Sequence, residues 1–176
     1  MGGLTLYYIQ SLIAHKTTYM VGSPIALGEV FLQAMDISCY SFIRIAHKAE
    51  HLMKNAGFLL TVSYYRAAKV VEHYNIMGPV KAAMESFVRY LVAELGPPGI
   101  RVNALSPGPL KTRDASGIAS FDKLINDARE RAPEPQLITI DDVDNIATGL
   151  VSDLAKSVTG NITFVDAGIT YWLNTS

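Results

Sequence analysis

The chain has 176 residues, of which 49% are hydrophobic and 18% are charged, and its formal net charge is −1. This composition indicates a single globular domain with a core and excludes a disordered chain. The lack of a basic excess argues against a nucleic-acid partner. The one cysteine, Cys39, cannot form an internal disulfide, so an oxidising compartment is not indicated and a buried thiol on a helix is expected.

Residues 1–27 are the least informative part of the sequence. They contain an uncharged, largely apolar run from Leu4 to Ile13 that no lysine or arginine precedes. Such a run is too short to span a bilayer and lacks the flanks of a signal peptide, so neither is predicted. The run is compatible with a strand or a short helix. We leave residues 1–27 as an unassigned segment and treat residues 28–176 as one unit.

A helix is predicted to follow the stretch from Phe31 to Ser38, because apolar residues fall on one of its faces at three- and four-residue steps. These residues are Phe42, Ile45, Ala46, Ala49, Leu52 and Met53. His47 and His51 stand four residues apart, which is the spacing of a zinc-binding pair. Lys48 occupies the place where a zinc protease would have glutamate, and no third ligand is evident. We therefore interpret the histidines as a surface pair and expect no metal site.

A buried strand followed by a long helix is predicted in the middle of the chain. The apolar, partly β-branched run from Gly57 to Ser63 is typical of a strand that ends near Tyr64. The helix is expected from about Tyr74 until the Gly96-Pro97-Pro98-Gly99 stretch stops it. Its apolar stripe consists of Val80, Met84, Phe87, Val88, Leu91 and Leu95.

Tyr74 and Lys81 are seven residues apart, close to two helical turns, so both side chains are expected on one side of this helix. A cation near a phenol favours the phenolate, which suits a proton donor or an oxyanion stabiliser. The simpler interpretation is a tyrosine at the edge of the core and a solvated lysine. The spacing alone does not decide between them.

The remaining elements follow from local signals. Residues Ile100 to Leu105 are predicted to form a strand, and Ser106-Pro107-Gly108-Pro109 to turn it sharply. Thr139 is expected to cap a helix, with Asp142 as the acidic partner in its first turn. A last strand is predicted from Asn161 to Val165.

In their order and spacing, these motifs resemble the short-chain dehydrogenase/reductase superfamily and, within it, the bacterial enoyl-[acyl-carrier-protein] reductases of type II fatty-acid synthesis. Most of the superfamily has Tyr-x3-Lys, whereas the enoyl reductases have Tyr-x6-Lys, as Tyr74 and Lys81 do. Tyr64, ten residues upstream, also matches. Further matching stretches are Pro109-Leu110-Lys111-Thr112, Ala115-Ser116-Gly117-Ile118, Thr139-Ile140-Asp141-Asp142-Val143 and Phe164-Val165-Asp166-Ala167-Gly168.

The resemblance implies a fold, an activity and a set of site residues. The fold would be α/β, a partial Rossmann-like, doubly wound parallel sheet flanked by helices. The activity would be reduction of the trans-2 double bond of an enoyl thioester on acyl carrier protein, with NADH or possibly NADPH, by a cytoplasmic homotetramer. The implied catalytic residues are Tyr64, Tyr74 and Lys81. The implied cofactor-binding residues are Lys81, Ser106, Gly108, Pro109, Leu110, Lys111, Thr112, Arg113 and Asp114, and the implied substrate-binding residues are Tyr64, Met77, Ile118 and Phe121.

Several departures from the family pattern leave a second interpretation open. The glycine-rich turn that receives the pyrophosphate is not in the sequence, and roughly the first 80 residues of the pattern are missing. Arg66-Ala67-Ala68 replaces the expected Gly-Ala-Glu, which removes a possible partner of Lys69, while Asp114 and Asp144 replace small residues. The chain is therefore either an enoyl reductase homologue or a truncated or degenerate relative that serves as an association module. A 3-oxoacyl reductase is disfavoured by the Tyr-x6-Lys spacing.

Overall fold

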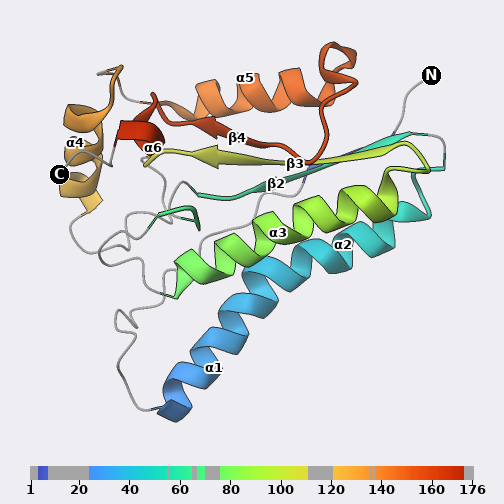
Figure 1. Ribbon diagram of the computed structural model, residues 1–176, viewed down its shortest axis with the longest axis horizontal. Coiled ribbons are helices and arrows are strands. Elements are labelled where there is room, and N and C mark those ends of the chain that lie inside the picture. The colour runs from blue at the N-terminus through green and yellow to red at the C-terminus, as the bar shows by residue number, and fades with distance from the viewer. Residues whose placement is uncertain are drawn as a thin grey trace.

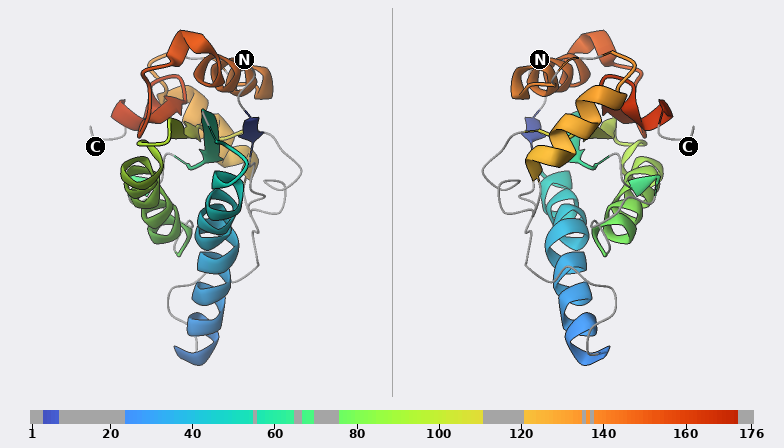
Figure 2. Two further views of the ribbon diagram at one scale, coloured as in Figure 1. Left: turned by 90° about the vertical axis from the view of Figure 1, so that its right-hand side faces the viewer. Right: turned by 90° about the vertical axis from the view of Figure 1, so that its left-hand side faces the viewer.

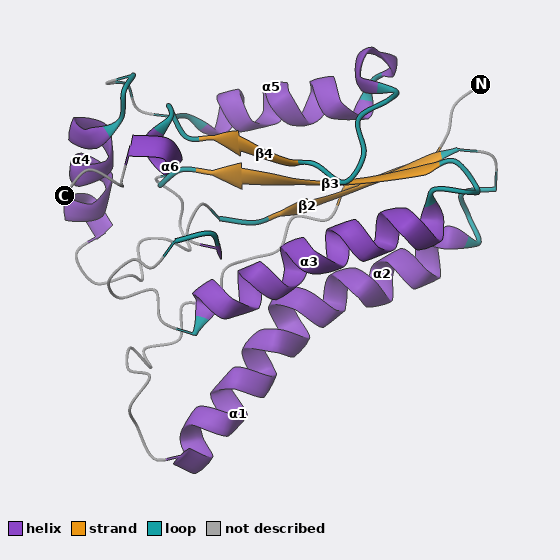
Figure 3. Cartoon of the chain, in the orientation of Figure 1, coloured by secondary structure: helices purple, strands orange, loops and turns teal. Residues whose placement is uncertain are grey.

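The computed structural model is a four-stranded parallel sheet with helices on both faces (Figures 1 and 3). It describes residues 4–7, 24–54, 56–64, 67–69, 76–110, 121–134, 136 and 138–172, and all their side chains except those of residues 4–7, 24–27, 121–124, 127 and 172. The strands are β1 (Leu4–Tyr7), β2 (Gly57–Val62), β3 (Ile100–Pro107) and β4 (Ile162–Val165), in the spatial order β1-β2-β3-β4. The predicted short parallel sheet flanked by helices is confirmed.

The edge of β2 that the sequence left open is occupied by a strand from the unassigned segment. β1 pairs in parallel with β2, with Leu4 opposite Gly57 and Tyr7 opposite Leu60. The backbone groups of β2 therefore find partners on both sides, since β3 pairs with its other edge from Gly57–Ile100 to Val62–Leu105. Of the two forms expected for the apolar run after Leu4, the strand is the one that residues 4–7 adopt.

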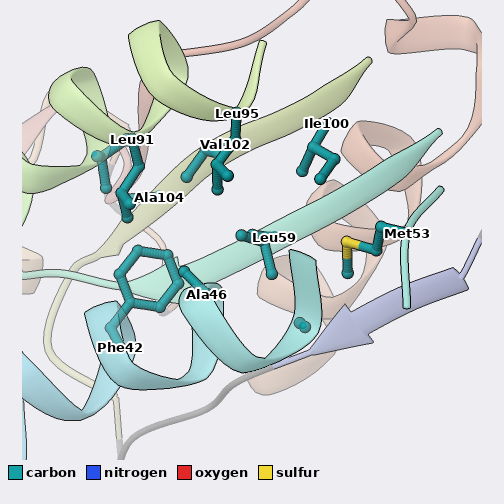
Figure 4. Close-up of a cluster of buried hydrophobic side chains, with 11 residues drawn as sticks. Phe42, Ala46, Met53, Leu59, Leu91, Leu95, Ile100, Val102 and Ala104 are labelled. Carbon is teal, nitrogen blue, oxygen red and sulfur yellow. The ribbon is translucent and has the colours of Figure 1, made fainter. Parts of the chain in front are cut away.

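One face of the sheet is covered by α2 (Ser41–Glu50) and α3 (Met77–Leu95), and the other by α5 (Ile140–Val151), as Figures 1 and 2 show. Strand side chains alternate between these faces. Leu59, Val102 and Ala104 belong to the cluster under α2 and α3, together with Phe42, Ala46, Ala49, Met53, Val88, Leu91, Leu95 and Ile100 (Figure 4). Phe58, Leu60 and Leu105 belong to the cluster under α5 with Ala147, Leu150 and Val165.

The first long helix is interrupted. It consists of α1 (Pro24–Met35), a π-helical turn (Asp36–Tyr40) and α2. Four of the six residues predicted on its apolar face are buried, Ile45 is half-buried, and Leu52 is 67% exposed. The prediction for Leu52 was wrong because α2 ends at Glu50, and the backbone N–H groups of Leu52 and Met53 then bond the carbonyls of Ala49 and Glu50 in a turn that no longer follows the helical period.

Helix α3 is confirmed, with its end at Leu95. Five residues of its predicted stripe are buried, but Phe87 is 38% exposed because it lies at one margin of the stripe. The predicted start near Tyr74 lies outside the described residues, which resume at Ile76. The Ser106–Pro107 pair, predicted as a turn, continues β3 instead, because Pro107 still pairs with Val165 of β4.

The carboxyl-terminal elements are α4 (Phe121–Arg131), α5, a 3₁₀ turn (Asp153–Ala155), β4 and α6 (Ile169–Trp172). The predicted cap of α5 is confirmed as a capping box, in which the Thr139 hydroxyl accepts from the Asp142 N–H and the Asp142 carboxylate accepts from the Thr139 N–H. These hydrogen bonds lower the pKa of Asp142. Asp144, noted as a departure from the family, is exposed on α5.

Arg101 of β3 closes the other end of α5. Its guanidinium donates to the carbonyls of Leu150 (2.7 Å) and Val151 (3.1 Å) in the last turn and to that of Ala155 (2.9 Å) beyond it. The same group lies 4.6 Å from the ring centroid of Phe58. The last carbonyls of a helix have no hydrogen-bond partner within the helix. The planar guanidinium of Arg101 supplies donors for them that water would otherwise provide.

Arg101→Lys is therefore expected to lower the free energy of unfolding by about 1–2 kcal/mol, because one ammonium cannot reproduce the forked set of bonds. Urea denaturation followed by circular dichroism measures the loss. Arg131→Lys is the matched control, since Arg131 is exposed in the last turn of α4. Equal stability of the two variants would contradict the assigned role.

Candidate active site at the carboxyl end of the sheet

The carboxyl ends of β2 and β3 bring together several of the predicted site residues. β2 ends at Val62, and the N–H of Ser63 still donates to the carbonyl of Leu105 at 2.6 Å. Tyr64 follows directly, half-buried, and its carbonyl accepts from the N–H of Ala67 at 2.9 Å. The strand thus places Tyr64 at the carboxyl end of the sheet, which is where ligands bind in open α/β folds.

Lys81 lies deep in this region rather than on the surface. Its side chain is 2% exposed, and its ammonium donates to the carbonyl of Val62 at 2.7 Å. Burial lowers the pKa of Lys81 to about 8, against the attraction of Cys39 and Glu85, which raises it. The interpretation of Lys81 as a solvated charge is therefore wrong, and a buried ammonium beside a strand end is what the sequence hypothesis needs.

Some predicted site residues lie outside the described residues, and the structure says nothing of their positions. They are Tyr74, Lys111, Thr112, Arg113, Asp114 and Ile118. Phe121 begins α4, but its side chain is not described. Met77 begins α3 and packs, half-buried, against the cluster of Cys39, Val80 and Met84.

The end of β3 offers a buried polar group. The Ser106 hydroxyl is fully buried and makes no hydrogen bond within the described part of the chain. By strand alternation it belongs to the α3 face, one residue beyond the pair of Val62 and Leu105. An unpaired buried hydroxyl costs free energy unless a ligand or water satisfies it, which makes this place a candidate ligand site.

Gly108 is fixed by packing. Its N–H donates to the carbonyl of Val165 at 2.9 Å, and a Cβ there would lie 3.2 Å from the Cα of Asp166. Pro109 and Leu110, which follow, are half-buried. Gly108 and Pro109 also line a small hollow with α4, whose other walls include Ile125, Arg129 and Asp166.

These groups fit the nicotinamide end of a dinucleotide. A sugar hydroxyl both donates and accepts hydrogen bonds, so it suits the Ser106 hydroxyl and the two N–H donors of Lys81 that Val62 does not take. The sequence supplies no glycine-rich turn for the pyrophosphate and adenosine end. The fit therefore concerns one half of the cofactor.

Three contacts between α3 and the end of β2 were not foreseen from the sequence. The Ser63 hydroxyl donates to the Glu85 carboxylate, Lys81 holds the Val62 carbonyl, and the Thr61 hydroxyl contacts the Met84 sulfur at 3.4 Å. The signal that could have revealed Glu85 is its place one helical turn after Lys81.

Lys69 also finds a partner that the sequence did not suggest. Its ammonium donates to the carbonyl of Thr170 in α6, and the Thr170 hydroxyl donates to the Asp166 carboxylate. The loop after Tyr64 is thereby tied to α6, the helix that follows β4. The alanine at position 68, where glutamate was expected, does not leave Lys69 unpaired.

His47 is exposed on α2 and His51 is exposed directly after its end, with the two rings 6.0 Å apart in an edge-to-face arrangement. Within the described ranges, no group of three or more histidine, cysteine or acidic residues could hold a metal ion. The helices of the same ranges include none that is both long and apolar enough to cross a membrane.

Comparisons with known proteins agree with the resemblance seen in the sequence. The sequence model of the family described as enoyl-(acyl carrier protein) reductase matches residues 25–170. An enoyl-[acyl-carrier-protein] reductase [NADH] of Rhizobium meliloti is 48% identical over 138 residues, which cover 78% of this chain and 51% of that protein. Another, from Synechocystis, is 45% identical over 80% of this chain and 54% of its own length. The chain thus spans about half the length of these curated relatives.

Solved structures give the same picture. The enoyl reductase of Anaplasma phagocytophilum in complex with NAD has a TM-score of 0.84 and 40% identity, over 95% of this chain and 61% of that one. The NADH-type enzyme of Aquifex aeolicus has a TM-score of 0.86 and 40% identity, over 94% of this chain and 64% of that one.

Proposed function

The chain belongs to the enoyl-[acyl-carrier-protein] reductase family, and from this premise we propose that it carries the catalytic residues of an NADH-dependent reductase of enoyl thioesters. The observation that carries the proposal is the buried ammonium of Lys81 at the end of β2, in a sequence with tyrosines at positions 64 and 74. Burying an ammonium costs free energy unless hydrogen bonds and opposite charges compensate it, so a lysine buried at a strand end is a candidate functional group.

In this proposal the two tyrosines and the lysine have different tasks. Tyr74 donates a hydrogen bond to the thioester carbonyl and stabilises the enolate that develops there. Lys81 binds the ribose hydroxyls and supplies positive charge near that phenol. Tyr64 closes the pocket and assists protonation. The nicotinamide, when bound, supplies the hydride for the β-carbon of the enoyl group.

The remaining assignments follow the same order. Ser106 at the end of β3 and Gly108, Pro109 and Leu110 after it contact the nicotinamide and pyrophosphate, and Lys111, Thr112, Arg113 and Asp114 also bind the cofactor. Met77, Ile118 and Phe121 line the acyl chain. The substrate is an enoyl thioester on acyl carrier protein, as the names of the relatives state for those enzymes, and NADH is preferred to NADPH.

We also propose that the active form is a homotetramer in the cytoplasm. Large apolar side chains are exposed on the outer side of α1, the π-helical turn and α3, and a partner subunit would cover them. They are Phe31, Leu32, Tyr40, Phe87 and Tyr90. Sedimentation equilibrium at several concentrations tests the assembly, with four chains of 19.2 kDa expected.

Titration of the purified chain with NADH and, separately, NADPH tests the function. We expect saturable NADH binding that Lys81→Ala weakens at least about tenfold, because ribose contacts of an ammonium are charge-assisted. Lys156→Ala is the control, since Lys156 is exposed in the turn after α5. The rate of NADH oxidation by a trans-2-enoyl thioester of acyl carrier protein should likewise fall in Lys81→Ala and stay unchanged in Lys156→Ala.

Absence of saturable binding at millimolar cofactor would overturn the reductase proposal for this chain. The interpretation as an association module would then account for the conserved fold. Equal affinity of the Lys81→Ala and Lys156→Ala variants would overturn the role of Lys81 alone.

A further inference from the structure

Three consecutive residues at the end of β2 are held by side chains from one turn of α3. Thr61 contacts Met84, the Val62 carbonyl accepts from Lys81, and the Ser63 hydroxyl donates to the Glu85 carboxylate. The next residue is Tyr64. The three residues before Tyr64, which is proposed to contact the substrate, are therefore positioned by α3 as well as by the neighbouring strands.

The contact between Ser63 and Glu85 is buried at one end and half-buried at the other. Ser63 is 3% exposed, while Glu85 lies at the margin of the covered face of α3. A hydroxyl that donates to a carboxylate forms a strong, charge-assisted bond, and a buried serine that lost it would be left unsatisfied. The bond thus fixes the serine that precedes Tyr64 to a definite place on α3.

Glu85 also faces the proposed ribose-binding lysine. Lys81 and Glu85 lie one turn apart on α3, a spacing that brings side chains together. Two groups within the described residues act electrostatically on Lys81: Glu85, and Cys39 from the π-helical turn packed against α3. Burial raises the pKa of the Cys39 thiol, so near neutral pH Cys39 is uncharged and Glu85 is the counter-charge.

Opposing influences act on the Glu85 carboxyl. Burial is the largest of them and raises the pKa of Glu85 above its usual value, while the hydrogen bond from Ser63 and the positive charges of Arg89 and Lys81 oppose that rise. Ser63 therefore acts on Lys81 through Glu85, because the hydrogen bond both orients the carboxylate and favours its charged form.

We propose that Glu85 is a positioning residue of this site, which holds Ser63 and hence the end of β2 in place for Tyr64, and which sets a carboxylate beside the Lys81 ammonium. The residue lies outside the set that the family pattern predicted from the sequence. Its importance for turnover rests on the proposed reductase function, but its action on Lys81 and Tyr64 can be measured without cofactor or substrate.

The experiment compares the wild type with Glu85→Gln, Glu85→Asp and Glu94→Gln. The last is the matched control, since Glu94 is exposed on the same helix. The chain is labelled with ¹³C at the lysine ε-carbons and the tyrosine rings, and the signals are assigned with Lys81→Met and Tyr64→Phe. The titration midpoint of Lys81 and the ring shifts of Tyr64 are then followed against pH by NMR.

Glu85→Gln is expected to move the Lys81 midpoint to lower pH by about half a unit or more, because the nearby negative charge is lost. Glu85→Asp should restore most of the difference, and Glu94→Gln should behave as the wild type. Ser63→Ala and Glu85→Gln should both displace the Tyr64 ring signals. In a chain that turns over enoyl thioester, Glu85→Gln should also move the alkaline limb of the pH profile to lower pH.

An unchanged Lys81 midpoint in folded Glu85→Gln would overturn the electrostatic role, and unchanged Tyr64 signals in Ser63→Ala would overturn the positioning role. Glu85→Asp, which keeps the charge, provides the comparison if Glu85→Gln does not fold. The NMR outcomes do not depend on NADH binding, so a failure of the reductase proposal would leave them intact.

Discussion

The free energy of unfolding is expected to rise by about 3 kcal/mol as the pH increases from 8 to 10.5, and Lys81→Met is expected to remove that rise. In the folded chain the pKa of Lys81 is lowered to about 8 from a usual 10.5, chiefly by burial. Between these values the unfolded chain binds a proton that the folded chain does not. Stability increases with pH wherever the unfolded state binds more protons, so the cost of burying the charged ammonium is full below pH 8 and is relieved above it.

The measurement is urea denaturation of the wild type and of Lys81→Met across this pH range. Methionine matches the length of the lysine stem and carries no charge, so the difference between the two chains isolates Lys81 from the other groups that titrate there. Lys48→Met, at an exposed position on α2, is the control for a lost surface charge. Parallel curves for the wild type and Lys81→Met would show that Lys81 is not buried as described.

The burial of Lys81 affects both the stability of the fold and the proposed function. The ammonium that the proposed reductase needs at the ribose is held at a cost to the fold, and among the described contacts the Val62 carbonyl, Cys39 and Glu85 offset part of that cost. A chain without a use for Lys81 would be free to replace it with an apolar residue of similar length. Retention of lysine there supports an active-site role.

The helix and strand pattern of the chain could be predicted well from local signals. The strand that begins at Gly57, the end of α3 at Leu95 and the cap at Thr139 each follow from a short-range rule about periodicity, helix stops or hydrogen-bonding side chains. Such rules concern residues within a few positions of each other, and the structure confirms them.

What could not be predicted depends on contacts between distant segments. The pairing of Ser63 with Glu85 joins a strand end to a helix 22 residues later, and the fork of Arg101 joins β3 to the end of α5 some 50 residues later. Periodicity indicates which face of a helix or strand is buried. It does not indicate which polar side chains form hydrogen bonds between the packed elements. The burial of Lys81 is of this kind, because the spacing to Tyr74 indicated a shared side of the helix and nothing about depth.

The errors at Leu52 and Phe87 show where periodicity stops being informative. Both are apolar and in phase with a buried stripe, yet one lies past the end of its helix and the other at the margin of its stripe. A pattern of spacings assumes that the helix continues and that the covering surface is wide. The first assumption fails at Leu52, and the second fails at Phe87.

The largest loss of stability from a single substitution is expected for Phe42→Ala, about 3–5 kcal/mol, because the ring is fully buried between α2 and the sheet (Figure 4). Its removal leaves a cavity among Ala46, Leu59 and Ala104, and the strands of a close-packed sheet cannot collapse into it. The free energy of unfolding from urea denaturation measures the loss.

Leu52→Ala is the matched comparison, since the sequence placed Leu52 on the same face as Phe42 whereas the structure exposes 67% of it. An exposed leucine contributes little, so this variant should lie within about 0.5 kcal/mol of the wild type. A loss at Leu52 as large as that at Phe42 would show that Leu52 is buried and would contradict the end of α2 at Glu50. The contrast between the two variants therefore tests the end of α2 at Glu50, which the periodicity of the sequence could not locate, as well as the core itself.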